Sequence, residues 1–247
     1  MIGDHFHVLA SVDSTNNYAM ARLNEGPVAE GTSWFAMEQT AGKGQRGKVW
    51  HSAPGENLLL TTVLQPAIPL TDQFMLSVAI SLGACDFFSK YAGDETRIKW
   101  SNDTYWRDRK AAGMLIENVL RGNIWQYAIV GIGFNINTGH FPEHLTKAVS
   151  LRQITGREWD AIELAKDLCR CFDRRYRQLE PARYNDLLSE YKSKLLRFNE
   201  TALYRQNGEL FEATITDVLL DGRLRLEKND QQILEPGFGE IEFVFTK

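Results

Sequence analysis

The sequence has no apolar run long enough to cross a membrane and no N-terminal signal peptide. A transmembrane helix needs about 20 consecutive apolar residues, and the longest apolar stretches here fall far short of that. The opening segment, MIGDHFHVLASVDSTNN, has no basic part followed by an apolar part. We therefore expect a soluble, cytoplasmic protein that has no membrane partner.

Cysteine and excess basic charge are also lacking. The chain has 3 cysteines, and Cys169 and Cys171 are separated by one residue in a helical pattern, so their side chains point to different faces. This arrangement does not make a disulfide framework, and we expect reduced thiols. The net charge is −4 at pH 7, which gives no global attraction for nucleic acid. We therefore expect no nucleic-acid partner.

The sequence also indicates neither a metal centre nor the nucleophile elbow of an α/β-hydrolase. The 5 histidines have no zinc-type spacing with cysteine or aspartate, and Pro142 disfavours a helix that would bring His140 and His144 together. No G-x-S-x-G sequence occurs. We expect no metal site built from protein side chains.

What is present is the composition of an ordinary globular protein, with 43% hydrophobic and 24% charged residues in a chain of 247. Apolar periodicity and turn residues predict an α+β fold. Strands are predicted at 32–38, 57–64 and 97–101, and in a hairpin of 112–120 and 124–136 with its turn at Gly122-Asn123. Helices are predicted at 14–24, 71–91, 161–179 and 181–196.

The pattern of apolar and turn residues changes near Arg197. Beyond it, short alternating segments are separated by the turn pairs Asn207-Gly208, Asp221-Gly222 and Pro236-Gly237. This pattern is typical of a small all-β module, which has too little core of its own and should dock on the main domain. We therefore predict a main domain at 1–197 and a β module at 198–247.

A basic glycine-rich loop, GKGQRGKVW at 42–50, is the most informative stretch. Its G-x-G-x-x-G spacing matches a dinucleotide fingerprint, but that site needs a helix at the third glycine, and here the loop runs into a turn and a strand. The glycines let backbone N–H groups approach an anion, Lys43, Arg46 and Lys48 supply counter-charge, and Trp50 offers a surface for a base. A mobile, solvent-exposed basic loop is the alternative.

Three further stretches carry candidate ligand groups. They are Lys99-Trp100-Ser101-Asn102-Asp103 at a strand end, Lys110 before the strand that contains Gly113, and the strand Gly131-Ile132-Gly133 leading to Asn135 and Asn137. A lysine at the edge of an apolar sheet face can neutralise an anion, and glycines inside a strand indicate close approach by a ligand or another strand. A solvated turn, a solvated strand entrance and tight sheet packing are the respective alternatives.

Taken in order, these stretches resemble the biotin protein ligases. The matching segments are Asp13-Ser14-Thr15-Asn16, Glu38-Gln39-Thr40-Ala41 leading into the loop, the stretch from Lys99 to Asp103, the strand from Arg109 to Glu117, and the strand from Gly131 to Asn135. An ordered match of several segments is far more specific than any one of them. The resemblance runs from about residue 8 to the C-terminus and includes the β module.

The resemblance implies a mixed β-sheet flanked by helices, as in class II synthetase-like biotin–lipoate ligase catalytic domains, followed by a small SH3-like β-barrel. It implies a reaction in which the carboxylate of biotin attacks the α-phosphorus of Mg·ATP, giving biotinyl-5′-AMP. The acceptor lysine of a biotin carboxyl carrier protein then attacks this mixed anhydride. Biotin, ATP and Mg²⁺ are thus expected, and a homodimer is left open. Some members carry an N-terminal helix-turn-helix, but only about a dozen residues precede Asp13, so we expect none here.

The resemblance also implies roles for individual residues. Biotin would be contacted by Ser14, Thr15, Asn16, Gln39, Lys43, Gly44, Gln45, Lys110, Gly113 and Gly131. ATP or the adenylate would be contacted by Lys43, Arg46, Lys48, Trp50, Lys99, Asn102 and Asn135, with Trp50 against the adenine. The catalytic residues would be Lys110, Arg46 and Asp103. Lys110 would neutralise the biotin carboxylate and the phosphate that it attacks, and Asp103 would orient a ligand or metal.

The chain departs from the family pattern at Lys43, Gln45 and Lys48, where arginine is usual, and at Ser101, where proline is usual. Gln45 matters most, because glutamine cannot supply the charge of a planar guanidinium, which bears on how firmly the intermediate is retained. Two alternatives stay open: a lipoate-type ligase of the same fold, and a non-catalytic module that binds biotin or nucleotide.

Overall fold

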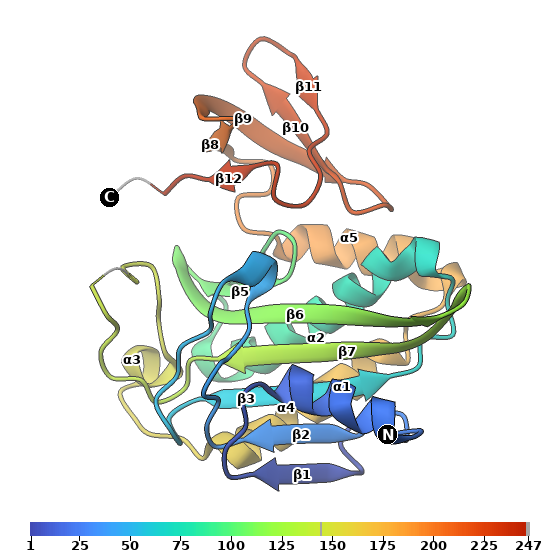
Figure 1. The fold of residues 1–247 in the computed structure, drawn as a ribbon. Coiled ribbons are helices and arrows are strands. Elements are labelled where there is room, and N and C mark those ends of the chain that lie inside the picture. Colours follow the sequence, from blue (N-terminus) through green and yellow to red (C-terminus); the bar gives the residue numbers. More distant parts are fainter. Residues whose placement is uncertain (144, 246–247) are drawn as a thin grey trace.

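The structure, a computed structural model, describes residues 1–143 and 145–245 and contains two β-sheets (Figure 1). His144, considered above with His140, lies outside the described residues. The large sheet has the order β1-β2-β3-β7-β6-β5-β4. Its strands are β1 (Phe6–Leu9), β2 (Ser33–Ala36), β3 (Leu58–Leu64), β4 (Thr96–Lys99), β5 (Asp103–Trp106), β6 (Arg109–Arg121) and β7 (Ile124–Phe134). Strands β1 and β2 are parallel and the other neighbours are antiparallel, which confirms the predicted mixed sheet.

Helices cover both faces of this sheet. They are α1 (Thr15–Glu25), α2 (Gln73–Ala92), α3 (Leu151–Thr155), α4 (Ala161–Tyr176) and α5 (Tyr184–Lys194). In Figure 1, α1 lies in front of the sheet, while α2 and α4 lie behind it. Strand β3 is buried along its whole length, as its continuous apolar run predicts. Its alternate residues serve the two faces, because Leu58 and Leu60 join the core beside α2 and Val63 joins the smaller cluster beneath α1.

The ends of the helices follow local sequence signals. Helix α1 ends at Gly26, whose N–H donates to the Arg22 carbonyl, and Asp160 caps α4 by accepting hydrogen bonds from two backbone N–H groups. Helix α2 begins at Gln73, two residues later than predicted, because a 3-10 turn at Leu70–Asp72 precedes it. No helix within the described ranges is long and apolar enough to cross a membrane.

The second sheet is antiparallel, with the order β11-β10-β9-β8-β12. Its strands are β8 (Thr201–Gln206), β9 (Glu209–Val218), β10 (Leu224–Lys228), β11 (Ile233–Leu234) and β12 (Glu242–Phe243). This agrees with a small C-terminal β domain, which Figure 1 shows beside α5. The side chain of Lys192 on α5 donates to Asp217 on β9 at 3.0 Å and links the two parts. We call residues 198–245 the C-terminal module below.

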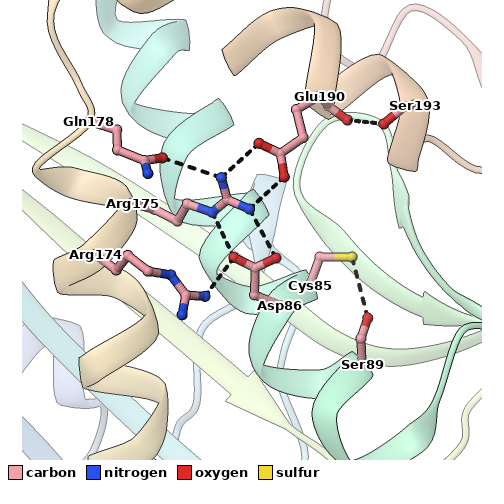
Figure 2. A network of polar contacts seen from close by, with 8 residues as sticks. All are labelled: Cys85, Asp86, Ser89, Arg174, Arg175, Gln178, Glu190 and Ser193. Atoms are coloured by element: carbon pink, nitrogen blue, oxygen red, sulfur yellow. Dashed lines mark hydrogen bonds and ion pairs between the residues drawn. The ribbon is translucent and has the colours of Figure 1, made fainter. Parts of the chain in front are cut away.

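An ion-pair network joins the three long helices behind the sheet (Figure 2). The guanidinium of Arg175 on α4 makes paired hydrogen bonds to Asp86 on α2, at 2.6 and 3.0 Å, and to Glu190 on α5, at 2.7 and 2.6 Å. Burial alone would lower the pKa of Arg175, but its bonds to the two carboxylates raise the pKa above the usual value. The same Asp86 also accepts from the exposed Arg174 at 2.9 Å. The network fixes α5, on which the C-terminal module sits.

Replacing Arg175 by methionine should lower the free energy of unfolding by about 3 kcal/mol. That is the lower end of the range for breaking a buried ion pair, because Glu190 is 39% exposed. The loss arises because Glu190 would be left without its cation and Asp86 would keep only the exposed Arg174. Urea denaturation measures it. Arg174→Met is the matched control: Arg174 contacts the same Asp86 but is 58% exposed, so its loss should stay below about 1 kcal/mol. Equal losses in the two variants would contradict this account of the network.

Candidate functional site

A cleft of about 730 Å³ lies between the large sheet and the C-terminal module. Every residue assigned above to a ligand or to catalysis lines it. These are Ser14, Thr15, Asn16, Gln39, Lys43, Gly44, Gln45, Arg46, Lys48, Trp50, Lys99, Asn102, Asp103, Lys110, Gly113, Gly131 and Asn135. Segments that are distant in the sequence therefore meet at one place.

The middle of the cleft floor is formed by two glycines that face each other across the β6–β7 hairpin. Gly113 and Gly133 are partners in the strand register, and the Trp50 indole lies directly on them. A Cβ at Gly133 would be 2.6 Å from the indole Cε2 and Nε1 atoms, and one at Gly113 would be 3.0 Å from Cζ3. Glycine is therefore required at 133. The buried indole Nε1 has no hydrogen-bond partner among the described residues.

Gly131 makes room for a side chain in the same way. A Cβ there would be 2.0 Å from Asn16 Oδ1, so the glycine admits the amide of the first turn of α1. Asn16 Nδ2 donates to Glu117 Oε2 at 2.7 Å, and the Thr61 hydroxyl lies 2.7 Å from Asn16 Oδ1. The close approach at this strand therefore comes from the protein's own Asn16 side chain, whereas the sequence pattern indicated a ligand or another strand.

The start of α1 is tied to the strand before the loop. Gln39 Oε1 accepts from the backbone N–H of Thr15 at 2.7 Å and from its hydroxyl at 2.9 Å. The side chain of Gln39 thereby occupies one N–H group of the first helical turn, which has no partner within the helix. Amides and hydroxyls of Thr15, Asn16 and Gln39 line this end of the cleft, and the charges of Lys43 and Glu117 beside them are paired with each other.

Lys110 reaches the cleft through an irregularity in β6. Thr104 pairs with Ala112 while Tyr105 pairs with Lys110, so β6 has one residue more than β5 at this point. Such a β-bulge re-aims a side chain, and Lys110 Nζ comes within 3.1 Å of the position a Cβ of Gly113 would take. Its ammonium group donates to Asp103 Oδ2 at 2.6 Å. Two of the three predicted catalytic residues are therefore paired, while the third, Arg46, has other partners.

The glycine-rich loop is a narrow turn. Gly44 N–H donates to the Lys48 carbonyl at 2.7 Å and Trp50 N–H to the Gly42 carbonyl at 2.8 Å, around a 3-10 turn at Gln45–Gly47. The side chain of Gln45 donates to Asn102 Oδ1 at 2.8 Å and to the Met114 carbonyl at 3.0 Å.

The cations of this loop point to different partners. Lys43 lies 3.7 Å from Glu117, and Arg46 donates to backbone carbonyls of the C-terminal module. Lys48 is exposed at the rim of the cleft.

Lys99 lies between aromatic rings at the opposite wall. Its ammonium nitrogen is 4.7 Å from the centre of the Phe243 ring and 5.9 Å from that of Tyr105. Burial, together with repulsion from Lys110 and Lys48, lowers the pKa of Lys99, and attraction by Asp103 offsets only part of this. A cation in such surroundings would be stabilised by an anionic ligand.

The side chain of Asn135 already makes hydrogen bonds within the protein. Its Nδ2 donates to the Lys110 carbonyl at 3.3 Å and to the Val149 carbonyl at 3.2 Å. This amide joins β6 to the segment after β7, and no hydrogen bond from the described residues reaches its Oδ1. The role predicted for Asn135 would therefore use its oxygen.

Some of the cleft wall is made of residues that the sequence patterns did not indicate. They are Phe238, Gly239, Ile241, Glu242, Phe243 and Phe245 of the C-terminal module, together with Phe141 and Leu145 to Ala148. The alternation of apolar residues after residue 240 predicts a strand but not its neighbour. The C-terminal module therefore contributes directly to the site.

The cleft changes in character along β6. Lys110 and Leu115 are five residues apart, which is roughly 15 Å at the rise of a strand. The cationic end holds Lys110 and Lys99. The neutral end lies near Leu115, which pairs with Gly131 in the sheet, and the Asn16 amide lies on Gly131. Such a site suits an elongated ligand whose ring is uncharged and whose other end is anionic.

Comparisons with known proteins point to one family. A model described as the Biotin/lipoate A/B protein ligase family matches residues 8–135. A biotin–[acetyl-CoA-carboxylase] ligase of Paracoccus denitrificans is 32% identical over 205 residues, which cover 80% of this chain and 84% of that protein. The bifunctional ligase/repressor BirA of Bacillus subtilis is 29% identical over 93% of this chain and 71% of its own length. The match to BirA of Bacillus spizizenii spans only 55% of that protein.

A solved structure has the same fold. The biotin protein ligase from Aquifex aeolicus in complex with biotin and ATP superposes with a TM-score of 0.80 at 25% identity, over 98% of this chain and 100% of that one.

Replacing Lys99 by methionine should stabilise the protein by about 0.5–2 kcal/mol at pH 7. The folded state lowers the pKa of Lys99 below its ordinary 10.5, so carrying the charge costs stability at every pH below the folded pKa. This cost disappears as the pH rises toward 10.5, and the gain from the substitution should shrink with it. Urea denaturation at several pH values measures the effect. Lys48→Met, at an exposed position, should change stability little; a Lys99→Met protein less stable at pH 7 than the parent would contradict the prediction.

Proposed function

Because the chain belongs to the biotin/lipoate A/B protein ligase family, we propose that it is an ATP-dependent biotin protein ligase. It activates biotin as biotinyl-5′-AMP and transfers the biotinyl group to the acceptor lysine of a biotin carboxyl carrier protein. The names of the relatives and the complex of the Aquifex aeolicus enzyme with biotin and ATP support this proposal.

The division of the cleft along β6 is the observation that carries the proposal. Biotin has an uncharged ureido ring that can donate and accept hydrogen bonds, and a carboxylate at the end of a flexible chain. The neutral end at Thr15, Asn16 and Gln39 suits the ring, and the end at Lys99 and Lys110 suits the carboxylate and the phosphates. A site that hydrogen-bonds the polar ring of its substrate discriminates against an analogue that cannot form those bonds. Lipoate, whose ring is a dithiolane, offers none.

The reaction requires charge stabilisation more than proton transfer in its first step. A carboxylate oxygen of biotin forms a bond to the α-phosphorus of ATP, and the bond from that phosphorus to the leaving pyrophosphate breaks. Lys110 lies where both anions would meet, so that it reduces their repulsion, and Asp103 holds its ammonium group in place at 2.6 Å. In the second step the amine of the acceptor lysine attacks the acyl carbon, AMP leaves with the bonding electrons, and the amine loses a proton.

The donor groups also fit magnesium that arrives with ATP. The described residues contain no group of three or more histidine, cysteine or acidic side chains that could hold a metal by themselves. Mg²⁺ is commonly bound through one or two carboxylates together with substrate phosphates, and Asp103 is a carboxylate on the cleft wall. Magnesium bound there would neutralise phosphate charge.

A direct test is to incubate the protein with Mg·ATP, a purified biotin carboxyl carrier domain, and either biotin or lipoate. Intact mass should show one biotinyl group on the carrier, and none when the acceptor lysine is replaced by arginine. Addition of lipoate instead would establish the lipoate-type alternative. A protein that binds biotin without releasing pyrophosphate would be the non-catalytic module.

Lys110→Ala should lower the rate of adenylate formation by about 10²–10³, because one preorganised electrostatic contact to the reacting anions would be lost. Biotin-dependent release of pyrophosphate measures the rate. Lys90→Ala is the control: this surface lysine pairs with Asp167 and should leave the rate unchanged. Formation of the adenylate at the parental rate would show that the role given to Lys110 is wrong.

Gln45→Arg should slow release of biotinyl-5′-AMP about ten- to a hundredfold. A guanidinium at this position could pair with the phosphate, and a charge-assisted hydrogen bond contributes about 1.5–3 kcal/mol, with 1.4 kcal/mol equal to a factor of ten. The dissociation rate is measured after loading with biotin and ATP, and labelling of bystander lysines should fall with it.

Gln45→Met separates the two properties of this side chain, because it removes the bonds to Asn102 and Met114 without adding charge. Equal release from the parent and Gln45→Arg would mean that another cation of the loop already holds the phosphate.

A further inference from the structure

The tip of the glycine-rich loop is attached to the C-terminal module. Arg46 Nη1 donates to the Gly239 carbonyl at 2.9 Å, and Nη2 donates to the Phe238 carbonyl. Both acceptors are neutral backbone groups that lie on consecutive residues. The planar guanidinium matches such a pair of acceptors, whereas an ammonium group does not.

The backbone of the loop is adapted to this contact. Arg46 has φ 56° and ψ 42°, a left-handed conformation that residues other than glycine rarely adopt. Such a conformation persists where the surroundings hold it. Gly44 and Gly47 flank this part of the loop and ease its tight turn. The carbonyls of Phe238 and Gly239 supply the contact that holds the Arg46 side chain.

The receiving turn has no room for a side chain while the Arg46 guanidinium lies on it. A Cβ at Gly239 would lie 1.7 Å from Arg46 Cζ and 1.8 Å from Nη1. The guanidinium therefore lies directly on the backbone of residue 239. Glycine at this position is a requirement of the contact itself, in addition to the φ of +75° that it adopts.

The same turn is also fixed to the strand end that carries Asn102 and Asp103. The Phe238 ring stacks on Trp100, with centroids 5.0 Å apart and planes at 21°, and it packs on Phe74 at 5.9 Å. Trp100 Nε1 in turn donates to the Gly222 carbonyl at 3.0 Å. One turn of the module thus contacts the loop on one side of the cleft and the β4–β5 connection on the other.

We propose that the Phe238–Gly239 turn is a positioning element that holds Arg46 and thereby keeps the glycine-rich loop over the cleft. Two of the five N–H donors of the guanidinium are used in this contact, so three remain for a phosphate. Through this turn the C-terminal module sets how long the activated intermediate is retained. The last statement rests on the proposed function, whereas the contact between loop and module does not.

The test compares two glycine substitutions in the C-terminal module. Gly239→Ala places a methyl group where the guanidinium lies. Gly208→Ala, in the β8–β9 turn, imposes a comparable backbone cost at φ +87° but has no atom within 4 Å of its Cβ. Hydrogen exchange of the amides at 43–50, without ligand, should be about three- to tenfold faster in Gly239→Ala than in the parent or Gly208→Ala.

Arg46→Lys removes the same contact from the loop side and leaves the sequence of the module unchanged. It should also accelerate exchange of these amides, so the test remains valid if Gly239→Ala does not fold. In both variants biotinyl-5′-AMP should dissociate faster by a similar factor, while the urea midpoint of Arg46→Lys stays at the parental value. The proposal would be overturned if the amides at 43–50 exchanged at the same rate in Arg46→Lys, in Gly239→Ala and in the parent. Faster loop exchange in both variants, together with a parent protein that forms no adenylate, would support the positioning contact and refute the proposed function instead.

Discussion

The cleft depends on side chains from distant segments lying directly on the backbone of the β6–β7 hairpin. The Trp50 indole lies on Gly133 and the Asn16 amide on Gly131, at distances that no Cβ would permit. A glycine inside a strand costs about 0.5–1 kcal/mol relative to alanine. The hairpin tolerates this cost because β7 pairs with the fully buried strand β3 along the whole length of β3. A rigid strand thus supports glycines on which side chains of the cleft can lie at backbone distance.

Much of the fold could be predicted because its signals are local. The buried strand at 57–64, the long helix behind it and the hairpin around Gly122-Asn123 all follow from apolar runs, periodicity and turn residues. Strands β1 and β5 were missed. Strand β5 begins at Asp103, which reads as turn chemistry beside Asn102, yet it becomes a strand because β4 and β6 supply hydrogen-bonding partners on both sides. That information lies in tertiary pairing.

The site shows the same limit more sharply. Motifs indicated residues that the structure places on the cleft wall, but no spacing in the sequence pairs Gly131 with Asn16 or Arg46 with Gly239. The β-bulge that turns Lys110 toward Gly113 is likewise defined by the register of a neighbouring strand. Sequence motifs therefore identify the chemistry of this cleft, while sheet register determines which groups can act together.

The cleft concentrates several unfavourable features in one place. Lys99 carries its charge with a lowered pKa, the Trp50 Nε1 group is buried without a partner among the described residues, and Arg46 has a left-handed backbone. An anionic ligand would stabilise Lys99 directly and could use the remaining donors of Arg46. Binding would then relieve costs that folding has already imposed, which increases the share of the contact energy that appears as affinity.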